Sequence, residues 1–330
     1  SLLVTADGQG NTVAGTNAGD SFTGTDALNN TLIGKDAGTA ITTGDSNTAV
    51  GQGALEANTT ASSNTAVGKD ALKANTTGTH NIALGYNTLS ANTTGNSNIA
   101  IGKDALSTCT TDASDNIAIG YDVMEDLTSG DYNVGVGNYA LEENTTGSNN
   151  VAVGYNALEV NTTGGSNTAV GASALDANTT GTDNAAIGSS SLSSNTTASF
   201  NTALGSNSLR DNTTGTSNAA VGINALLNNT TASNNTALGA NALKVNTGGN
   251  NTAVGTNASD ANTSGTNNAS LGFNSLGENT TGSSNTAVGM AALNMNTTAS
   301  DNTAVGTYAL TSNTTGSANC AVGKDALYAN

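Results

Sequence analysis

Polar and apolar residues follow one pattern along almost the whole chain. An Asn begins each repeat, and eighteen such Asn residues occur between Asn30 and Asn319. Fifteen of the seventeen intervals between them are 17 residues long, one is 18 and one is 16. The consensus is N-T-A-V-G-x-N-A-L-x-x-N-T-T-G-S-x, numbered here as positions one to seventeen. A repeat of nearly constant length predicts a solenoid, in which each repeat forms one coil and buries its apolar residues by stacking on its neighbours.

Two positions of the repeat are aliphatic and one is always Gly. Position four is Val, Ile or Leu in all eighteen copies, position nine is Leu in fifteen, and position five is Gly in all eighteen. We therefore expect positions four and nine to point into the core, with Ala at position three and Gly at position five on the other face of the strand. The expected core includes Val50, Leu55, Val67, Leu72, Leu84, Leu89, Val153, Leu158, Val170 and Leu175.

The repeat is too short for a pair of helices and suits short strands. Known helical repeats are about 33 residues or longer, and Asn-Thr-Thr-Gly forms turns more readily than helix. We expect an all-β parallel solenoid of about eighteen coils, with a first strand around position four and a second around position nine. Coils stacked ~4.8 Å apart would make a rod about 85 Å long.

The invariant Gly and the two Asn columns are expected to hold neighbouring coils together. Gly at position five suits a tight corner with positive φ or a close backbone approach. Asn at positions one and twelve is expected to form amide ladders from coil to coil. The expected ladder and corner residues include Asn64, Gly68, Asn81, Gly85, Asn98 and Gly102.

Residues 1–29 carry a degenerate form of the repeat, and residues 30–330 carry the regular form. The first segment opens with Leu2, Leu3 and Val4, a sequence typical of a β-strand. We expect it to act as an assembly strand that completes the last coil of another copy, giving head-to-tail polymers. The chain starts with Ser1 rather than Met, which indicates a processed product or a fragment.

Composition and charge exclude several classes of function. The 330 residues include no Pro, 7 basic and 24 acidic residues, for a net charge of −17. A sheet ladder excludes Pro because Pro has no N–H to donate. The negative charge argues against nucleic acid and anionic membrane surfaces as partners, and no apolar run approaches the ~20 residues that membrane insertion needs. All seven basic residues lie at positions six and ten, so we expect both positions to face solvent.

No group of residues predicts catalysis, a cofactor or a metal site. His80 is the one His, and the repeat places no nucleophile or acid with it. Cys109 and Cys320 would lie roughly 60 Å apart in the expected rod, which excludes an intramolecular disulfide. Acidic residues such as Glu142 and Glu143 are interpreted as a solvated face, with weak divalent-cation binding as the alternative.

Two columns leave a functional alternative open. Asn at position twelve is followed by Thr-Thr or Thr-Ser in thirteen repeats, and each copy matches a glycosylation acceptor. We favour a ladder Asn in a turn, since a regular column explains the spacing without sugar. Position six carries several large apolar residues, which would suit a carbohydrate or a neighbouring fibre, but we favour tolerated surface variation. These residues are Tyr86, Tyr121, Tyr155, Ile223 and Phe273.

The run Asn-Thr-Ala-Val-Gly-Lys-Asp-Ala-Leu at residues 64–72, repeated along the chain, resembles the head repeats of trimeric autotransporter adhesins. It also resembles the Asn-Thr-Ala-Val-Gly repeats of phage tail-fibre-like proteins. The resemblance covers about residues 30–330, although the repeat is longer here than in the adhesins. It implies a homotrimer of β-rolls that is extracellular, on a cell surface or on a virion.

These observations predict a structural extracellular fibre or filament subunit rather than an enzyme, with the chain itself as partner in a homotrimer or a head-to-tail polymer. The alternative is a receptor-binding adhesin or phage tail-fibre shaft, whose partner would be a cell-surface glycan or protein. An ice-binding solenoid is a minor alternative. It is disfavoured because the adjacent Thr residues of Asn-Thr-Thr should face opposite ways rather than form a flat array.

Overall fold

The Asn-Thr-Ala-Val-Gly run of each repeat forms a strand of three residues. The computed structural model describes residues 5–22, 26–110 and 113–328, and the strand covers positions two to four in each repeat. Thr, Val and Ile at these positions favour extended backbone because their branched side chains fit a pleated surface. Gly at position five then turns the chain, with a φ of 140° at Gly34, so the strand ends there.

The chain divides into two units, Ser1–Ser166 and Asn167–Asn330. The first unit contains β1 (Thr5–Ala6), β2 (Thr12–Ala14), β3 (Thr31–Ile33), β4 (Thr48–Val50), β5 (Thr65–Val67), β6 (Ile82–Leu84), β7 (Ile99–Ile101), β8 (Ile117–Ile119), β9 (Val134–Val136) and β10 (Val151–Val153). The second contains β11 (Thr168–Val170), β12 (Ala185–Ile187), β13 (Thr202–Leu204), β14 (Ala219–Val221), β15 (Thr236–Leu238), β16 (Thr252–Val254), β17 (Ala269–Leu271), β18 (Thr286–Val288), β19 (Thr303–Val305) and β20 (Cys320–Val322).

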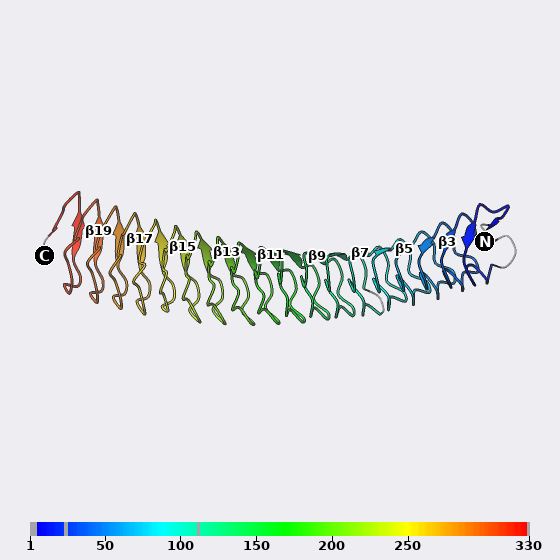
Figure 1. The fold of residues 1–330 in the computed structure, drawn as a ribbon. Helices are drawn as coiled ribbons and strands as arrows, with labels where there is room; N and C mark the ends of the chain where they lie inside the picture. The colour runs from blue at the N-terminus through cyan, green and yellow to red at the C-terminus, as the bar shows by residue number, and fades with distance from the viewer. Residues whose placement is uncertain (1–4, 23–25, 111–112, 329–330) are drawn as a thin grey trace. The chain divides into compact units, whose positions relative to one another are not determined.

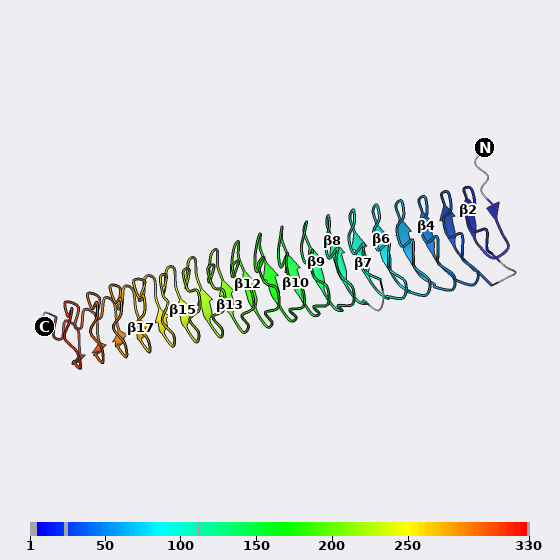
Figure 2. The same cartoon turned by 90° about the horizontal axis from the view of Figure 1, so that it is seen from below.

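Strands of successive coils pair in parallel and in register within each unit. Ala49 lies opposite Ala66 in the first unit, and Ala186 lies opposite Ala203 in the second. Figure 1 shows the strands of neighbouring coils side by side, and Figure 2 shows the same stacking from below. The predicted all-β parallel solenoid is therefore confirmed. Within the described residues, no helix has the length and apolar character needed to cross a membrane.

The degenerate first repeat joins the same sheet as the regular repeats. β2 pairs in parallel with β3, and β1 pairs antiparallel with β2 through Thr5 and Ala6. The predicted assembly strand of Leu2, Leu3 and Val4 lies outside the described residues.

The core is formed by positions three, eight and nine, so the prediction for position four was wrong. Position nine is buried as expected: Leu55, Leu72, Leu89, Leu158 and Leu175 are each 0% exposed. Position four points outward instead: Val50, Val67 and Val170 are half-buried, Val153 is 37% exposed and Leu84 is 45% exposed. Ala at position three takes the inward place, as at Ala66 and Ala152, and Ala at position eight joins it.

The thinness of each coil explains why Ala points inward. The interior already holds Leu at position nine and two buried Asn side chains, so a branched residue at position three would overfill it. The repeat that has Leu32 at position three has Gly38 at position nine, and a Cβ on Gly38 would lie 2.7 Å from a Leu32 methyl carbon. Where position nine is Ser259, the next coil has Ser270 at position three, and the two hydroxyls are 2.9 Å apart.

The predicted second strand is absent from the described repeats, because positions six to eleven form turns. Leu at position nine adopts the left-handed conformation there, with a φ of 53° at Leu158. Bulky residues rarely occupy this region. The conformation directs the Leu side chain into the coil, and its complete burial offsets the backbone strain.

The Asn columns bond successive coils in two different ways. At position twelve Asn75 Nδ2 donates to Asn58 Oδ1 at 2.9 Å, which is the predicted amide ladder. At position one the predicted ladder of Asn64, Asn81 and Asn98 runs through the backbone: Asn64 Oδ1 accepts the Asn81 N–H at 3.0 Å, and Asn81 Oδ1 accepts the Asn98 N–H at 2.9 Å. The side-chain NH₂ of Asn64 donates to the carbonyl of position fifteen in the same coil.

Gly at position five satisfies both reasons predicted for it. Its φ is 139° at Gly68, 145° at Gly85 and 135° at Gly102. A Cβ on Gly137 would lie 2.6 Å from the carbonyl oxygen of Gly154 in the next coil. Any side chain here would force the stacked coils apart.

Replacing the buried Leu158 with Ala should lower the free energy of unfolding by about 2–5 kcal/mol, because it leaves a cavity between stacked coils. Val153→Ala, in the same repeat but outside the core, should cost about 0.5 kcal/mol. Urea unfolding of dilute protein measures both. If both variants lose the same free energy of unfolding, position four belongs to the core and the observed outward direction of Val153 is wrong.

Candidate acidic and aromatic site

The basic residues at position six face solvent as predicted, and at position ten Lys73 is exposed whereas Arg210 and Lys244 are half-buried. The side chains of Lys35, Lys69 and Lys103 are 59%, 50% and 51% exposed. Each forms an ion pair with the Asp that follows it in sequence. The shortest distances from Nζ to a carboxylate oxygen are 2.6 Å, in the pairs Lys35–Asp36 and Lys103–Asp104.

The glycosylation-like Asn column is buried. Asn58, Asn75 and Asn92 are 0% exposed, and each side-chain amide donates to the carbonyl of position fifteen. The interpretation as a ladder Asn is confirmed. A folded coil offers no access for a sugar at these nitrogens.

The two Cys and the His lie apart from any shared site. Cys109 replaces a ladder Asn, its Sγ lies 3.9 Å from Asn92 Oδ1, and burial raises the pKa of its thiol to about 12. Cys320 is exposed at the start of β20, and both thiols are free. His80 is exposed, with Nδ1 3.1 Å from Thr79 Oγ1.

The large residues at position six are mostly exposed. Tyr86 is 48%, Tyr155 55%, Ile223 53% and Phe273 51% exposed. Tyr121 is only half-buried because Tyr139, at position seven of the next repeat, packs edge-on against it with ring centroids 5.4 Å apart.

Tyr139 extends this contact into a ladder of rings in the first unit. Its ring also meets Tyr155 edge-on, with centroids 5.8 Å apart. At the other end, Lys103 Nζ lies 4.8 Å from the centroid of Tyr121. The sequence prediction named Tyr121 and Tyr155 but missed Tyr139, because only the coil path brings position seven against position six of both neighbours.

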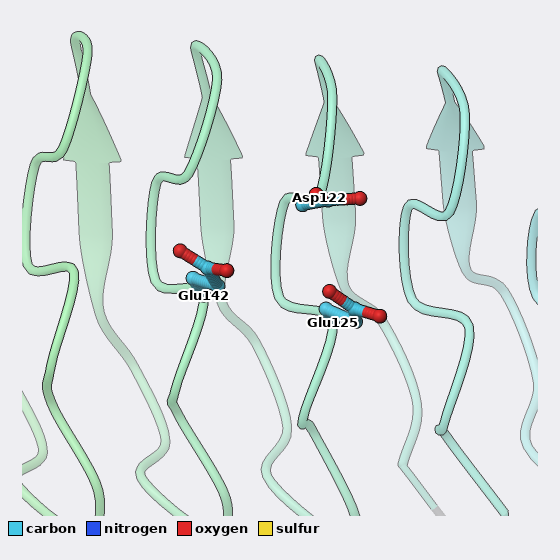
Figure 3. Close-up of side chains that lie close together, drawn as sticks. All are labelled: Asp122, Glu125 and Glu142. Atoms are coloured by element: carbon cyan, nitrogen blue, oxygen red, sulfur yellow. The ribbon is translucent and has the colours of Figure 1, made fainter.

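Three carboxylates gather beside this aromatic ladder. Asp122 and Glu125 lie at positions seven and ten of one coil, and Glu142 lies at position ten of the next (Figure 3). One carboxylate oxygen from each lies within 4.8 Å of the others. Glu125 and Glu142 sit at about the same height on adjacent coils, and Asp122 lies above Glu125 on the same coil.

The core beneath these residues differs from that of the other coils. Position eight is Val123 and position nine is Met124, in place of the usual Ala-Leu, and both are fully buried. The following coil has Gly135 at position three, where a Cβ would lie 2.6 Å from Val123 Cγ1 and 2.9 Å from Met124 Cε. The Gly makes room for the two larger side chains, so the sizes of the core residues in these two coils match one another.

Burial and like charges both raise the pKa values of the glutamates in the cluster. Burial, followed by the charges of Glu159, Asp122 and Glu125, raises the pKa of Glu142 to about 7. Burial and the charge of Asp122 also raise the pKa of Glu125. Carboxylates this close compete for the same proton or cation.

Asp122 is the most confined of the three. It is 8% exposed, and its carboxylate makes no hydrogen bond or ion pair with any residue in the described part of the chain. Lys103, whose charge lowers the pKa of Glu125, bonds to another carboxylate: its hydrogen bond to Asp104 is the main cause of its own raised pKa. The carboxylate oxygens are therefore only partly solvated and have no counter-ion, and this arrangement suits a cation as ligand.

The sequence contained a signal for this cluster that our interpretation did not use. Position ten is Glu in three consecutive repeats, at Glu125, Glu142 and Glu159. In-register stacking brings such residues side by side, so a run of like charge in one column predicts crowding. The part played by Asp122 could be seen only in the structure, where the turn places position seven above position ten.

In comparisons with known proteins, the sequence matches no family model and no curated protein.

Converting Glu142 to Gln should change how stability depends on pH in metal-free protein. The folded-state pKa of about 7 lies above the ordinary value of 4.5, so the wild type should lose stability as pH rises from about 4.5 to 7. The variant should escape this loss, a difference on the order of 1 kcal/mol because water screens a half-exposed carboxylate. Urea midpoints with chelator across this range measure it.

Glu56→Gln controls for the loss of one carboxylate, because Glu56 occupies position ten but faces Lys73 at 3.6 Å. If Glu142→Gln and the wild type have parallel stability profiles between pH 4.5 and 7, the carboxylates do not crowd one another as described.

Proposed function

We propose that this protein is a structural, non-enzymatic subunit of an extracellular fibre, at a cell surface or on a virion, and that copies associate side by side as a homotrimer. The observation that carries the proposal is the outward column of aliphatic residues at position four. The resemblance of the repeat to adhesin heads and tail-fibre repeats agrees with it.

The side chains at positions two and four of β3–β20 are here called the outer sheet face. In β6–β10 both positions are aliphatic in every strand. These residues are Ile82, Leu84, Ile99, Ile101, Ile117, Ile119, Val134, Val136, Val151 and Val153. All ten are half-buried or exposed, with Ile82 at 40% and Leu84 at 45%. A contiguous apolar surface of this kind is typical of an interaction site.

The size of the face favours association along much of the chain. Seven strand spacings of ~4.8 Å make the outer face of β3–β10 about 34 Å long, and a three-residue strand is about 10 Å wide. The resulting area of about 340 Å² is less than half of the ~800 Å² that each partner buries in a standard interface. We therefore expect stable association only when the outer faces of both units take part.

Position four of the second unit continues the pattern. Ile187, Leu204, Leu238 and Leu271 are between 42% and 49% exposed. Because apolar contacts are non-directional, their in-register columns would pack against the same columns of another copy. A receptor-binding shaft would share this assembly and add a ligand surface, for which the exposed aromatic residues at position six are the candidates.

Ice binding is the second candidate, and one observation favours it. Position two, on the outer sheet face, is Thr in nine of the eighteen regular repeats, beside an aliphatic residue at position four. The adjacent Thr residues of Asn-Thr-Thr lie at positions thirteen and fourteen, outside this face. The Thr column is interrupted by the five aliphatic strands β6–β10, which is why we favour self-association.

Self-association is tested by replacing Ile82, Leu84 and Ile119 with Lys. The wild type should sediment as a trimer, and the triple variant as a monomer with an unchanged circular dichroism spectrum. Ile223→Lys, at an exposed residue outside the outer sheet face, is the matched control and should remain trimeric. A monomeric wild type, or a triple variant that assembles normally, would refute the proposal.

Ice binding is tested by thermal hysteresis, the difference between the melting and freezing temperatures of ice in the protein solution. A self-associating fibre should show no more hysteresis than an albumin solution of the same concentration. Hysteresis that disappears in a Thr202→Tyr and Thr236→Tyr double variant, at the outer sheet face of β13 and β15, would establish ice binding instead.

A further inference from the structure

Another pair of coils in the same unit shows what balances carboxylates at positions seven and ten. Lys73, at position ten, has its Nζ 3.2 Å from Asp70 Oδ1 in its own coil and 3.6 Å from Glu56 Oε2 in the adjacent coil. An ammonium therefore lies between a position-seven carboxylate and a position-ten carboxylate.

The acidic cluster combines the same positions seven and ten without a base, and its third carboxylate lies on the following coil rather than on the preceding one. Glu125 occupies the place of Lys73, so Asp122, Glu125 and Glu142 face one another with no base among them. Position seven of the preceding coil adds Asp104, which already bonds Lys103 and Asn87. Nothing in the described residues neutralises Asp122, although it is nine-tenths buried.

We propose that Asp122, Glu125 and Glu142 bind a Ca²⁺ ion that bridges two adjacent coils. The ion supplies the positive charge that Lys73 provides beside Asp70 and Glu56. Three carboxylates supply up to six oxygens, and water completes the coordination on the exposed side. These three residues lie outside the outer sheet face, so the proposed Ca²⁺ site does not depend on self-association.

The ligand set suits Ca²⁺ better than Mg²⁺. Ca²⁺ accepts about 6–8 oxygens in flexible geometry, whereas Mg²⁺ demands near-ideal octahedral geometry and dehydrates reluctantly. One oxygen from each carboxylate lies within 4.8 Å of the others, inside the range of about 4.6–5.2 Å that separates opposite ligands of Ca²⁺ bound at 2.3–2.6 Å. Carboxylate oxygens are also the hard ligands that Ca²⁺ prefers to nitrogen or sulfur.

The neighbouring Tyr residues provide a direct readout. Burial raises the pKa of the Tyr139 phenol most, and the neighbouring Tyr121, Asp122, Tyr155 and Glu142 add to this effect, which places the phenol beside the cluster. Tb³⁺ substitutes for Ca²⁺ and emits when a nearby Tyr is excited, and the chain has no Trp to interfere. Emission on Tyr excitation therefore reports binding at this cluster.

The test titrates full-length protein with Tb³⁺ and then displaces Tb³⁺ with Ca²⁺ or Mg²⁺. The wild type should emit, and Ca²⁺ should compete at roughly 10⁻⁴–10⁻³ M, as in extracellular calcium modules, with Mg²⁺ at least ten-fold weaker. Asp122→Asn and Glu142→Gln should each weaken Tb³⁺ binding at least ten-fold. Both are isosteric and remove repulsion, so the fold should persist. Glu56→Gln, whose carboxylate faces Lys73, should bind as the wild type does.

Thermal unfolding gives a second readout. Millimolar Ca²⁺ should raise the unfolding temperature of the wild type and of Glu56→Gln, but not that of Asp122→Asn or Glu142→Gln. Absent emission, equal binding by the wild type and both cluster variants, or an equal Ca²⁺ effect on all four proteins would overturn the proposal.

Discussion

The fold depends on close, in-register stacking of the backbone from one coil to the next. Gly at position five permits this contact, since a Cβ on Gly137 would reach the carbonyl oxygen of Gly154 at 2.6 Å. The Asn columns then bond one coil to the next, through amide pairs such as Asn75–Asn58 and through side chain to backbone at position one. Because each coil between the two ends is bonded to the coil before it and the coil after it, residues at the same position of the repeat stack in columns. The burial, charge and contacts of a residue therefore depend on its column.

Stacking has opposite consequences for different residue types. A column of Leu at position nine is buried, and a column of aliphatic residues at position four forms a continuous apolar face. A column of Glu is crowded, since Glu125 and Glu142 stand at about the same height on adjacent coils (Figure 3). A single Lys, such as Lys73 beside Glu56, relieves the crowding. The same geometry therefore supports both the proposed self-association and the proposed Ca²⁺ site.

The repeat length, the parallel solenoid and the roles of Leu158, Gly102 and Asn75 could be predicted from the sequence, because each is a property of one column. The inward or outward direction of position four could not. A strand of three residues has only two alternating faces, and the choice between Ala152 and Val153 depends on how much room the coil leaves. The sequence did contain evidence for that choice, since Leu32 at position three occurs with Gly38 at position nine. Contacts between different columns, such as Asp122 with Glu142 or Tyr139 with Tyr155, depend on the turn from position five to position ten.

The reactivity of Cys320 tests most directly the claim that the outer sheet face is an interface. This exposed thiol lies at position two of β20, on that face, whereas Cys109 is buried and its pKa is raised to about 12. Unmodified protein therefore has one reporter thiol. The rate of Cys320 labelling should fall as protein concentration rises through the range in which sedimentation detects the oligomer. A labelling rate that is the same in the dilute monomer and in the oligomer would contradict the account.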